Sequence, residues 1–448
     1  WENVTPKDAP KWMMWNSVEV DPFKKGAAYF VGTRYKVDDY TPYIYKTEDY
    51  GKTWKLITTG IDKMHFTRAM RADRKRPGLL YAGTEYGMYI SYDDGAIWKP
   101  FQLNLPVVPI TDLTIKDNDL IVATQGRSVW IMDDLTLFQE AKQEILQNRL
   151  YVFEVKPALR MQRAGGRFER MMGGTAQNMG TNPPIGAVIN FYAKNVTDST
   201  KASITVYGKD SGPIKTFSTD AKDPGYKIEI TQGMNQFVWD LLYPPADRAE
   251  GMILWNGTPG PILAAPGKYY AKIKVGKDSV RVEFDVVADP VYKMTNADYE
   301  EQRDFLLNTT ELFNKVQSHI KDIRTLRTQI NELSSRWGKE TPQEFKDQAD
   351  AINKQLTVIE ETLYQTKSKS GQDPLNFPIR LNDKISGLFD VVSSGNMRPS
   401  RQAFEVFGEL ARQCSKEFEK FEKIKREELP KLNQLIREKQ LPVIGLRN

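Results

Sequence analysis

The spacing of apolar residues changes along the chain. Residues 1–142 and 150–290 contain short runs in which apolar residues alternate with polar ones or stand together between turn residues, as in β-strands. Residues 295–440 place apolar residues at every third or fourth position, which is the spacing of amphipathic helices. We therefore predict two β domains followed by a helical domain.

The helical region contains the pattern of four helices. The sequence Thr295-Asn296-Ala297-Asp298 resembles a capping box with Asp in place of Glu, which marks the start of the first helix. Short connections lie near Ser370-Gly371 and between Asn396 and Pro399, and Pro430 should break or kink the last helix. The expected helical spans are 305–333, 345–363, 379–392 and 403–421. Helices joined in this way predict an up-down four-helix bundle over 295–440.

The middle region combines strands with one long loop. Residues 160–186 are rich in Gly, Met and Asn and carry arginines that are able to bind an acidic partner, although packing against a neighbouring domain is the expectation we favour. The expected strands are 187–192, 203–207, 226–230, 236–241, 269–275 and 280–287. Short antiparallel strands over this length predict an Ig-like β-sandwich for residues 150–290.

Two octets repeat within the first domain. Residues 47–54 and 91–98 both follow the pattern Ser/Thr-x-Asp-x-Gly-x-x-Trp. The aspartate can accept backbone N–H groups of its own turn, and the glycine permits a positive φ where the chain reverses. The tryptophan then buries a large ring at the start of the next strand. Each octet is expected to close a hairpin, with structural roles for Asp49, Gly51, Trp54, Asp93, Gly95 and Trp98.

Two further stretches are related to these octets. Residues 120–134 repeat the strand and the Thr that precede each octet, and align Asp133 with the octet aspartates, but lack the glycine and the later tryptophan. Residues 1–5, Trp-Glu-Asn-Val-Thr, match residues 54–58, Trp-Lys-Leu-Ile-Thr. We therefore expect that Trp1 is the tryptophan of an earlier copy.

The octets resemble the Asp-box repeats of sialidase-type and sortilin-type β-propellers. The whole chain is similar to the C-terminal half of a bacterial class usually labelled glycosyl hydrolase or sortilin-like, through residues 39–43, 78–85, 104–109, 123–127 and 371–382. The resemblance implies a secreted or envelope protein with Asp-box propeller blades (1–142), an Ig-like sandwich (150–290) and a helical bundle (295–440). Propellers close with about four to eight blades. We therefore expect missing N-terminal blades, or another chain, to complete the ring.

Composition narrows the function. The chain has 63 Lys and Arg against 58 Asp and Glu, a net charge of +5, and no basic run, so nucleic-acid binding has no electrostatic support. No apolar run is long enough for a transmembrane helix. With two histidines and one cysteine there is no cluster with metal-ligand spacing, and no nucleotide-binding motif is present. We expect no metal and no cofactor.

Candidate binding residues follow the strands that end in Gly-Thr or Ala-Thr. The turns at opposite ends of propeller strands emerge on opposite faces, so the loops after Thr33, Thr84 and Thr124 should lie away from the octets. Their candidates for gripping a sugar or a peptide are Arg34, Tyr35, Glu85, Tyr86, Gln125 and Arg127. Salt bridges that line the channel are the alternative, and the one we favour.

Catalysis has weaker support. The related class often carries Thr-His-Gly-Arg in its last blade, and here Gln125 replaces the histidine, which weakens an acid–base role. Glycoside hydrolysis needs two facing carboxylates, and Asp38, Asp39, Glu85, Asp133 and Asp134 are available. The prediction is an extracytoplasmic binding or scaffold protein, secreted, periplasmic or associated with an outer membrane, that holds a protein, peptide or glycan in an envelope assembly. The alternatives are a secreted glycoside hydrolase and a sortilin-like peptide receptor.

Overall fold

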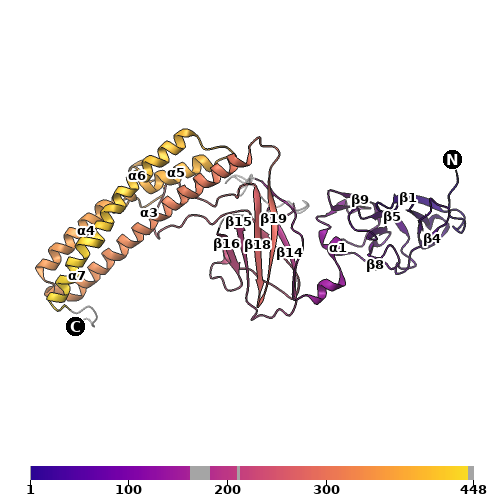
Figure 1. Cartoon of the computed structure of the whole chain (residues 1–448), viewed down its shortest axis with the longest axis horizontal. Helices are drawn as coiled ribbons and strands as arrows, with labels where there is room; N and C mark the ends of the chain where they lie inside the picture. Colours follow the sequence, from indigo (N-terminus) through magenta and orange to yellow (C-terminus); the bar gives the residue numbers. More distant parts are fainter. Residues whose placement is uncertain (1, 162–181, 209–211, 442–448) are drawn as a thin grey trace. The chain divides into compact units, whose positions relative to one another are not determined.

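The computed structural model describes residues 2–161, 182–208 and 212–441 of the chain. The chain divides into two compact units, Trp1–Glu154 and Val155–Asn448 (Figure 1). The expectations for Trp1 and for the arginines Arg163, Arg167 and Arg170 lie outside the described residues. In the described part no helix is long and apolar enough to cross a membrane.

The first unit contains three antiparallel sheets in which sequential strands are neighbours. The first sheet comprises β1 (Met14–Val20), β2 (Ala28–Arg34), β3 (Asp39–Thr47) and β4 (Lys55–Leu56). The second comprises β5 (Thr67–Ala72), β6 (Leu80–Thr84), β7 (Gly87–Ser91) and β8 (Lys99–Pro100). The third comprises β9 (Ile110–Lys116), β10 (Asp119–Thr124) and β11 (Val129–Met132).

These three sheets stack in a propeller-like arrangement. The first strands of successive sheets are neighbours, because β1 contacts β5 and β5 contacts β9. Alternate residues of each sheet fill the two spaces between sheets, with Val31, Ile44, Met70 and Trp98 in the first and other apolar side chains in the second. The short helices α1 (Thr136–Glu140) and η2 (Gln143–Gln147) follow the third sheet, and η1 (Tyr35–Val37) joins β2 to β3.

Each octet forms a hydrogen-bonded turn between the third and fourth strands. In the second octet the Ser91 hydroxyl donates to Asp93 at 2.8 Å and accepts from the Gly95 N–H at 2.9 Å. Asp93 accepts the Ile97 N–H at 2.9 Å, and Gly95 has a φ of 82°. Thr47, Asp49, Gly51 and Thr53 make the same contacts in the first octet. The octet side chains therefore accept hydrogen bonds from backbone N–H groups that have no partner strand in this turn.

The octet tryptophans join each sheet to the chain segment that precedes it. Trp98 donates its indole N–H to the Ile57 carbonyl at 2.7 Å and is 2% exposed. Trp54 donates to the Val4 carbonyl, also at 2.7 Å, so Val4 stands to the first sheet as Ile57 stands to the second. Val4 and Ile57, which are aligned in the sequence match between residues 1–5 and 54–58, therefore make equivalent contacts to an octet tryptophan.

The third sheet corrects one alignment. Thr47, Ser91 and Met132 occupy the same register position, because they lie opposite Ala28, Leu80 and Leu120 at the start of the second strand. The residue equivalent to Asp93 is therefore Asp134, not Asp133. Asp134 accepts hydrogen bonds from the Thr136 N–H at 3.0 Å and from its hydroxyl at 2.5 Å.

The second unit begins with two sheets whose aromatic side chains face each other. Within this unit, one sheet pairs β14 with β17 and the other has the order β13-β19-β18-β15-β16, whereas β12 belongs to the first unit. Trp239 contacts Tyr269 and Phe284 with ring centroids 5.3 and 6.0 Å apart, which joins the two layers. The bounds are β12 (Leu150–Val152), β13 (Ala158–Arg160), β14 (Ala187–Ala193), β15 (Ala202–Gly208), β16 (Pro213–Ser218), β17 (Gly233–Trp239), β18 (Gly267–Val275) and β19 (Asp278–Ala288).

One predicted strand of this region is wrong, and three strands, β12, β13 and β16, were not predicted. Residues 226–230 form no strand, because the chain turns in η3 (Pro224–Tyr226), where Asp223 accepts the Gly225 N–H at 2.8 Å. The strand that pairs with β15 is instead β16.

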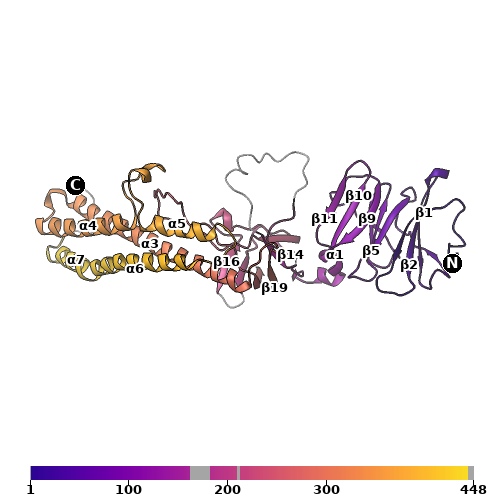
Figure 2. The ribbon, with the colours of Figure 1, turned by 90° about the horizontal axis from the view of Figure 1, so that it is seen from above.

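The helices form three antiparallel rods. The first rod is α3 (Asn296–Trp337), which begins at the predicted capping box on Thr295 and Asp298. The second contains α4 (Gln343–Leu363) and then α5 (Leu381–Ser393), and the third contains α6 (Arg401–Lys423) and α7 (Leu429–Glu438) (Figure 2). The helices η4 (Gly338–Glu340) and η5 (Asp373–Leu375) lie in connections. The four predicted helices are present, but α4 and α5 share one rod, so the bundle has three rods where we predicted four.

Pro430 does not break the last rod. A π-helical turn, η6 (Ile424–Glu428), joins α6 to α7, and Pro430 lies in the first turn of α7. The wider turn accommodates a residue that has no N–H to donate and whose ring would clash with a regular α-helix. Cys414 is fully buried in this rod, and burial raises the pKa of its thiol to about 12.

Candidate functional site

The candidate ligand residues follow the second strand of each sheet in the first unit. The loops β2–β3, β6–β7 and β10–β11 lie at the ends of the strands opposite the octets, because neighbouring strands are antiparallel. The segment from Ile57 to Phe66, which leads from the first sheet to the second, returns to the same end. Residues that are far apart in sequence therefore meet there.

An aromatic–arginine cluster, comprising Tyr35, Tyr40, Phe66, Arg68 and Glu85, joins the first two sheets at this end. Tyr35 stacks on Phe66 with centroids 5.0 Å apart, and Tyr40 lies 6.0 Å from the same ring. The Arg68 guanidinium lies 5.6 Å from the Tyr35 ring and 5.2 Å from the Phe66 ring. Its Nε donates to Glu85 at 2.6 Å. The structure thus brings Tyr35 and Glu85 together through Arg68.

The cluster has a buried base and a half-exposed rim. Phe66 is 3% exposed, whereas Tyr40 is 37% exposed. Aromatic faces with a guanidinium held over them suit the apolar faces of a sugar or the side chains of a peptide. Glu85 and Arg68 neutralise each other, so the cluster offers shape and π surface more than net charge.

Tyr86 belongs to a second group beside the cluster. Its ring stacks on His65 at 4.7 Å, and His65 Nδ1 lies 2.8 Å from the Tyr89 hydroxyl. Tyr86 is 49% exposed, so much of its outer face is open to solvent. Burial raises the pKa of Tyr89. The imidazole is thus held from both sides, as a support for Tyr86.

Arg34 is occupied within its own sheet. Its Nη1 pairs with Asp39, which also accepts a hydrogen bond from the Tyr43 hydroxyl at 2.8 Å. Burial opposes ionisation of Asp39, but hydrogen bonds from Thr41 and Tyr43 and the charge of Arg34 outweigh it and lower the pKa. Arg34 therefore fixes the shape of the β2–β3 loop. This contact agrees with a structural role for this candidate.

The candidates of the third sheet do not join the cluster in any recorded contact. Gln125 is held by its backbone N–H, which donates to the Pro109 carbonyl at 2.9 Å, and Arg127 donates to the adjacent Gly126 carbonyl at 3.1 Å. Both side chains are exposed. They are available to a ligand, but the loop itself does not order them.

A second group of charges lies on the innermost strands. Arg71 of β5 donates to Asp112 of β9 at 2.8 Å and lies 3.9 Å from Glu19 of β1, so one guanidinium connects three sheets. Burial raises the pKa of Glu19, against the lowering effect of the Ala72 N–H and of Arg71 and Arg74. Asp112 keeps 64% of its side chain exposed. This trio links the three sheets through residues that the sequence analysis did not single out.

Sequence reasoning missed the residues that hold the cluster. Phe66 and Arg68 lie beyond the loops that we considered, on the approach to β5 and within it. An exchange of side chains between adjacent sheets has no local pattern, so only the two-residue spacing of Phe66 and Arg68 on one face of the strand gave a signal. Across the described residues no group of His, Cys, Asp or Glu could hold a metal ion.

Comparisons with known proteins give limited overlaps. No protein-family model and no curated protein matches the chain. The structure of YCF48 bound to D1 peptide is 19% identical over 27% of this chain and 37% of its own length, with a TM-score of 0.21. The GH74 enzyme of Niastella koreensis is 8% identical over 60% of this chain and 38% of its own, with a TM-score of 0.23. The GH74 xyloglucanase of Xanthomonas campestris is 12% identical over 60% of this chain and 38% of its own, with a TM-score of 0.22. The chain therefore spans less than half the length of these structures.

Proposed function

We propose that the protein is an extracytoplasmic binding or scaffold protein, whose propeller-like unit holds a peptide, protein or glycan at the end opposite the octets. The observation that carries the proposal is the aromatic–arginine cluster of Tyr35, Tyr40, Phe66, Arg68 and Glu85. Its aromatic faces are built on two sheets and anchored by a buried ring, so a ligand meets a surface that is already ordered. Preorganised aromatic surface binds at low entropic cost.

The charges at this end also favour binding over catalysis. Asp39 is engaged by Arg34 and Tyr43, and Glu85 is engaged by Arg68. Hydrolysis of a glycosidic bond needs two carboxylates that face the substrate, and here each carboxylate is paired with an arginine.

The test is a glycan and peptide array probed with the purified chain, followed by affinity measurements on single variants. Tyr40→Ala and Tyr86→Ala should each weaken binding about tenfold, since stacked aromatic anchors dominate such surfaces. Tyr50→Ala is the matched control, because Tyr50 is 65% exposed and lies in the first octet, at the other end of the strands. Binding to no member of the array, or equal losses in all three variants, would overturn the proposal.

A second candidate is a glycoside hydrolase that uses the innermost strands. The observation in its favour is Glu19, whose pKa is raised by burial, beside the exposed carboxylate of Asp112. Glycoside hydrolysis needs two facing carboxyl groups, and a raised pKa such as that of Glu19 is typical of the general acid. Release of reducing sugar from a polysaccharide, abolished by Glu19→Gln, would support this function. Full retention of that release in Glu19→Gln would exclude it.

We also propose that the octets are Asp-boxes and that a further sheet, from the same protein or another chain, covers the open face of the first sheet. That face has a hollow of about 450 Å³ whose walls include Val4, Val20, Phe30, Tyr50 and Trp54. Val4 contributes the contact to Trp54 that Ile57 makes to Trp98. In the full natural protein, hydroxyl-radical labelling of Trp54 should fall below that in this chain alone. Equal labelling would contradict this arrangement.

The remaining assignments rest on this proposal. The two aromatic-faced sheets of the second unit are proposed to form an Ig-like sandwich that acts with the helices as a docking platform in an envelope assembly. The protein would then be secreted, periplasmic or associated with an outer membrane, and fractionation of the native cells tests this location. A sortilin-like peptide receptor remains within the proposal, and binding of peptides but not of glycans on the array would select it.

A further inference from the structure

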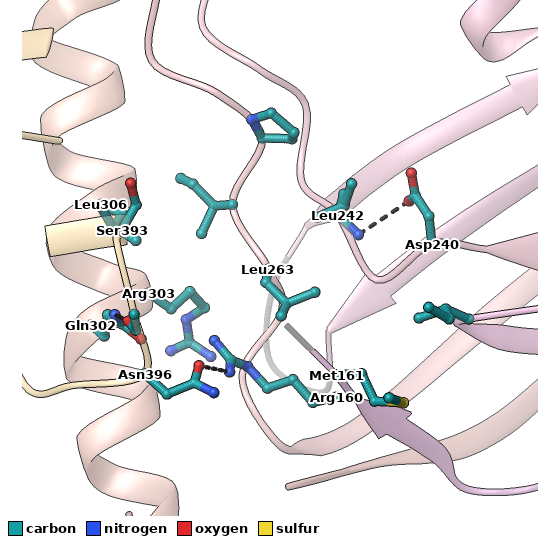
Figure 3. A pocket seen from close by; sticks show the side chains of 14 residues that line it. Arg160, Met161, Asp240, Leu242, Leu263, Gln302, Arg303, Leu306, Ser393 and Asn396 are labelled. Atoms are coloured by element: carbon teal, nitrogen blue, oxygen red, sulfur yellow. Dashed lines mark hydrogen bonds between the residues drawn. The ribbon is translucent and has the colours of Figure 1, made fainter. Parts of the chain in front are cut away.

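A cavity of about 310 Å³ in the second unit lies between the sheets and the helices. Figure 3 shows its walls: the end of β13 with Arg160, the chain after β17, the loop around Leu263, the start of α3, and the connection from α5 to α6. Apolar side chains, among them Leu242, Leu263 and Leu306, line much of it. The side chains of Arg160, Arg303 and Asn396 lie together at one end.

Arg160 is buried in this wall, and the described residues give it no acidic partner. It is 5% exposed, its Nε donates to the Ala264 carbonyl at 2.9 Å, and its guanidinium lies 4.5 Å from the Tyr299 ring. Its Nη1 donates to the Asn396 side-chain oxygen. Among the described residues no carboxylate forms an ion pair with it. A buried cation is costly unless an anion compensates its charge, and contact with a ring offsets only part of that cost.

Two further groups point to the same place. Arg303, from α3, projects its guanidinium toward that of Arg160 (Figure 3), and its only recorded ion pair in the described structure is with the exposed Asp304, through Nε. The side-chain Nδ2 of Asn396 is buried and has no hydrogen-bond partner in the part of the chain that the structure describes. A buried amide donor that lacks an acceptor loses the free energy of a hydrogen bond. The site thus holds two converging positive charges and one unused donor.

The carboxylate in the wall does not meet this need. Asp240 accepts the Leu242 N–H at 3.1 Å and lies 3.9 Å from Lys215, so a backbone donor and another cation already occupy it. In Figure 3 it lies at the other end of the cavity from the two guanidinium groups. Within the described residues, the charge of Arg160 is therefore still uncompensated.

We propose that this cavity binds a small organic anion, whose oxygens lie between Arg160, Arg303 and the Asn396 amide and whose apolar body lies against Leu242, Leu263 and Leu306. Guanidinium groups bind carboxylate and phosphate oxygens with paired hydrogen bonds, so the shared chemistry is an oxyanion. The volume suits a small molecule, since ligand pockets begin at about 300 Å³. The proposed site is independent of the aromatic–arginine cluster in the first unit.

The test is calorimetric titration of the full chain at constant ionic strength with pentanoate, glycerol phosphate, inorganic phosphate and the neutral analogue pentanamide. Binding of pentanoate or of a phosphate, without binding of pentanamide, supports the proposal and identifies which oxyanion the site takes. Arg303→Gln should weaken that binding about tenfold through loss of a charge-assisted contact. Arg281→Gln is the control, because Arg281 is an exposed arginine of β19 that pairs with Glu283.

A second variant tests the missing charge directly and needs no truncation of a packed side chain. Asn396→Asp places a carboxylate against Arg160, so it should raise the thermal unfolding temperature without ligand and abolish anion binding. Failure of all the anions to bind, equal binding of pentanamide, or unchanged anion binding in Asn396→Asp would each overturn the proposal. None of these outcomes bears on the function proposed for the first unit.

Discussion

Gly60 tests how tightly the first two sheets of the propeller-like unit fit together. It has a φ of 97°, and a Cβ at this position would lie 2.2 Å from the Trp98 carbonyl oxygen and 3.2 Å from the Trp98 nitrogen. The adjacent Thr59 carbonyl accepts the Trp98 N–H at 2.9 Å. The glycine thus lets one backbone lie directly against another, and neither can rotate away as a side chain would.

The expected cost of Gly60→Ala has two parts. A left-handed conformation costs a residue with a Cβ about 1–2 kcal/mol. Forcing an additional methyl group into a packed site costs about 1–3 kcal/mol more. Gly126→Ala separates the two, because Gly126 has a φ of 84° and its Cβ would meet nothing within 4 Å. We therefore expect a loss of about 2–5 kcal/mol for Gly60→Ala and about 1–2 kcal/mol for Gly126→Ala.

The measurement is hydrogen exchange in increasing urea, followed by mass spectrometry of peptides that cover residues 55–132, so that both glycines are included. Local exchange is needed because a chain with two units need not unfold in one step. The free energy of opening in these peptides should fall in Gly60→Ala by clearly more than in Gly126→Ala. Equal effects in the two variants would refute the contact between Gly60 and the Trp98 backbone as the cause.

Three further predictions concern single contacts. Tyr29→Phe removes the 2.6 Å hydrogen bond to Asp94 that joins the first two sheets, and should destabilise them by about 1.5 kcal/mol in the same exchange experiment. Hydrogen bonds from the Thr53 N–H and hydroxyl lower the pKa of Asp49, so its stabilisation is full above its unfolded pKa of about 3.9 and is lost as the pH falls through the lower folded pKa. The urea midpoints of the wild type and Asp49→Asn should therefore differ at pH 7 and converge in acid. Glu360→Gln, in a buried pair with Arg324 and Arg327, should lower the stability of the helices by about 3 kcal/mol, whereas exposed Glu332→Gln should leave it unchanged in circular dichroism melts.

Local patterns account for what the sequence predicted well. The capping box at Thr295 and Asp298 and the apolar spacing in α3, α4, α5 and α6 depend on residues within a few positions of one another. The octets are equally local, since Asp93 bonds to a backbone N–H four residues away. Features of this kind are encoded in short windows and can be recognised without knowledge of the tertiary structure.

Features that depend on distant partners were not predicted. The helix after residue 401 stays continuous through a π-turn because its buried side chains, including Cys414 and Phe421, hold it against the other rods. Arg160 and Asn396 meet across 236 positions of sequence. Neither residue stands in a motif, and for the arginines of residues 160–186 the sequence favoured packing against a neighbouring domain over an acidic partner. That the described residues leave the charge of Arg160 uncompensated became clear only from its neighbours in the structure.

The choice between binding and hydrolysis in the first unit depends on Arg71. Its guanidinium lies between Glu19 and Asp112 and donates to Asp112 at 2.8 Å. A hydrolase needs that space for the sugar, and it needs one carboxyl group to gain a proton, which an adjacent guanidinium opposes. Burial raises the pKa of Glu19 despite the charge of Arg71, which is the direction expected of a general acid. Removal of the positive charge in Arg71→Met should raise this pKa further, as carboxyl titration by NMR would show. If the same variant gained no hydrolytic activity, Glu19, Arg71 and Asp112 would serve only to link the sheets. The aromatic–arginine cluster would then remain the proposed binding surface.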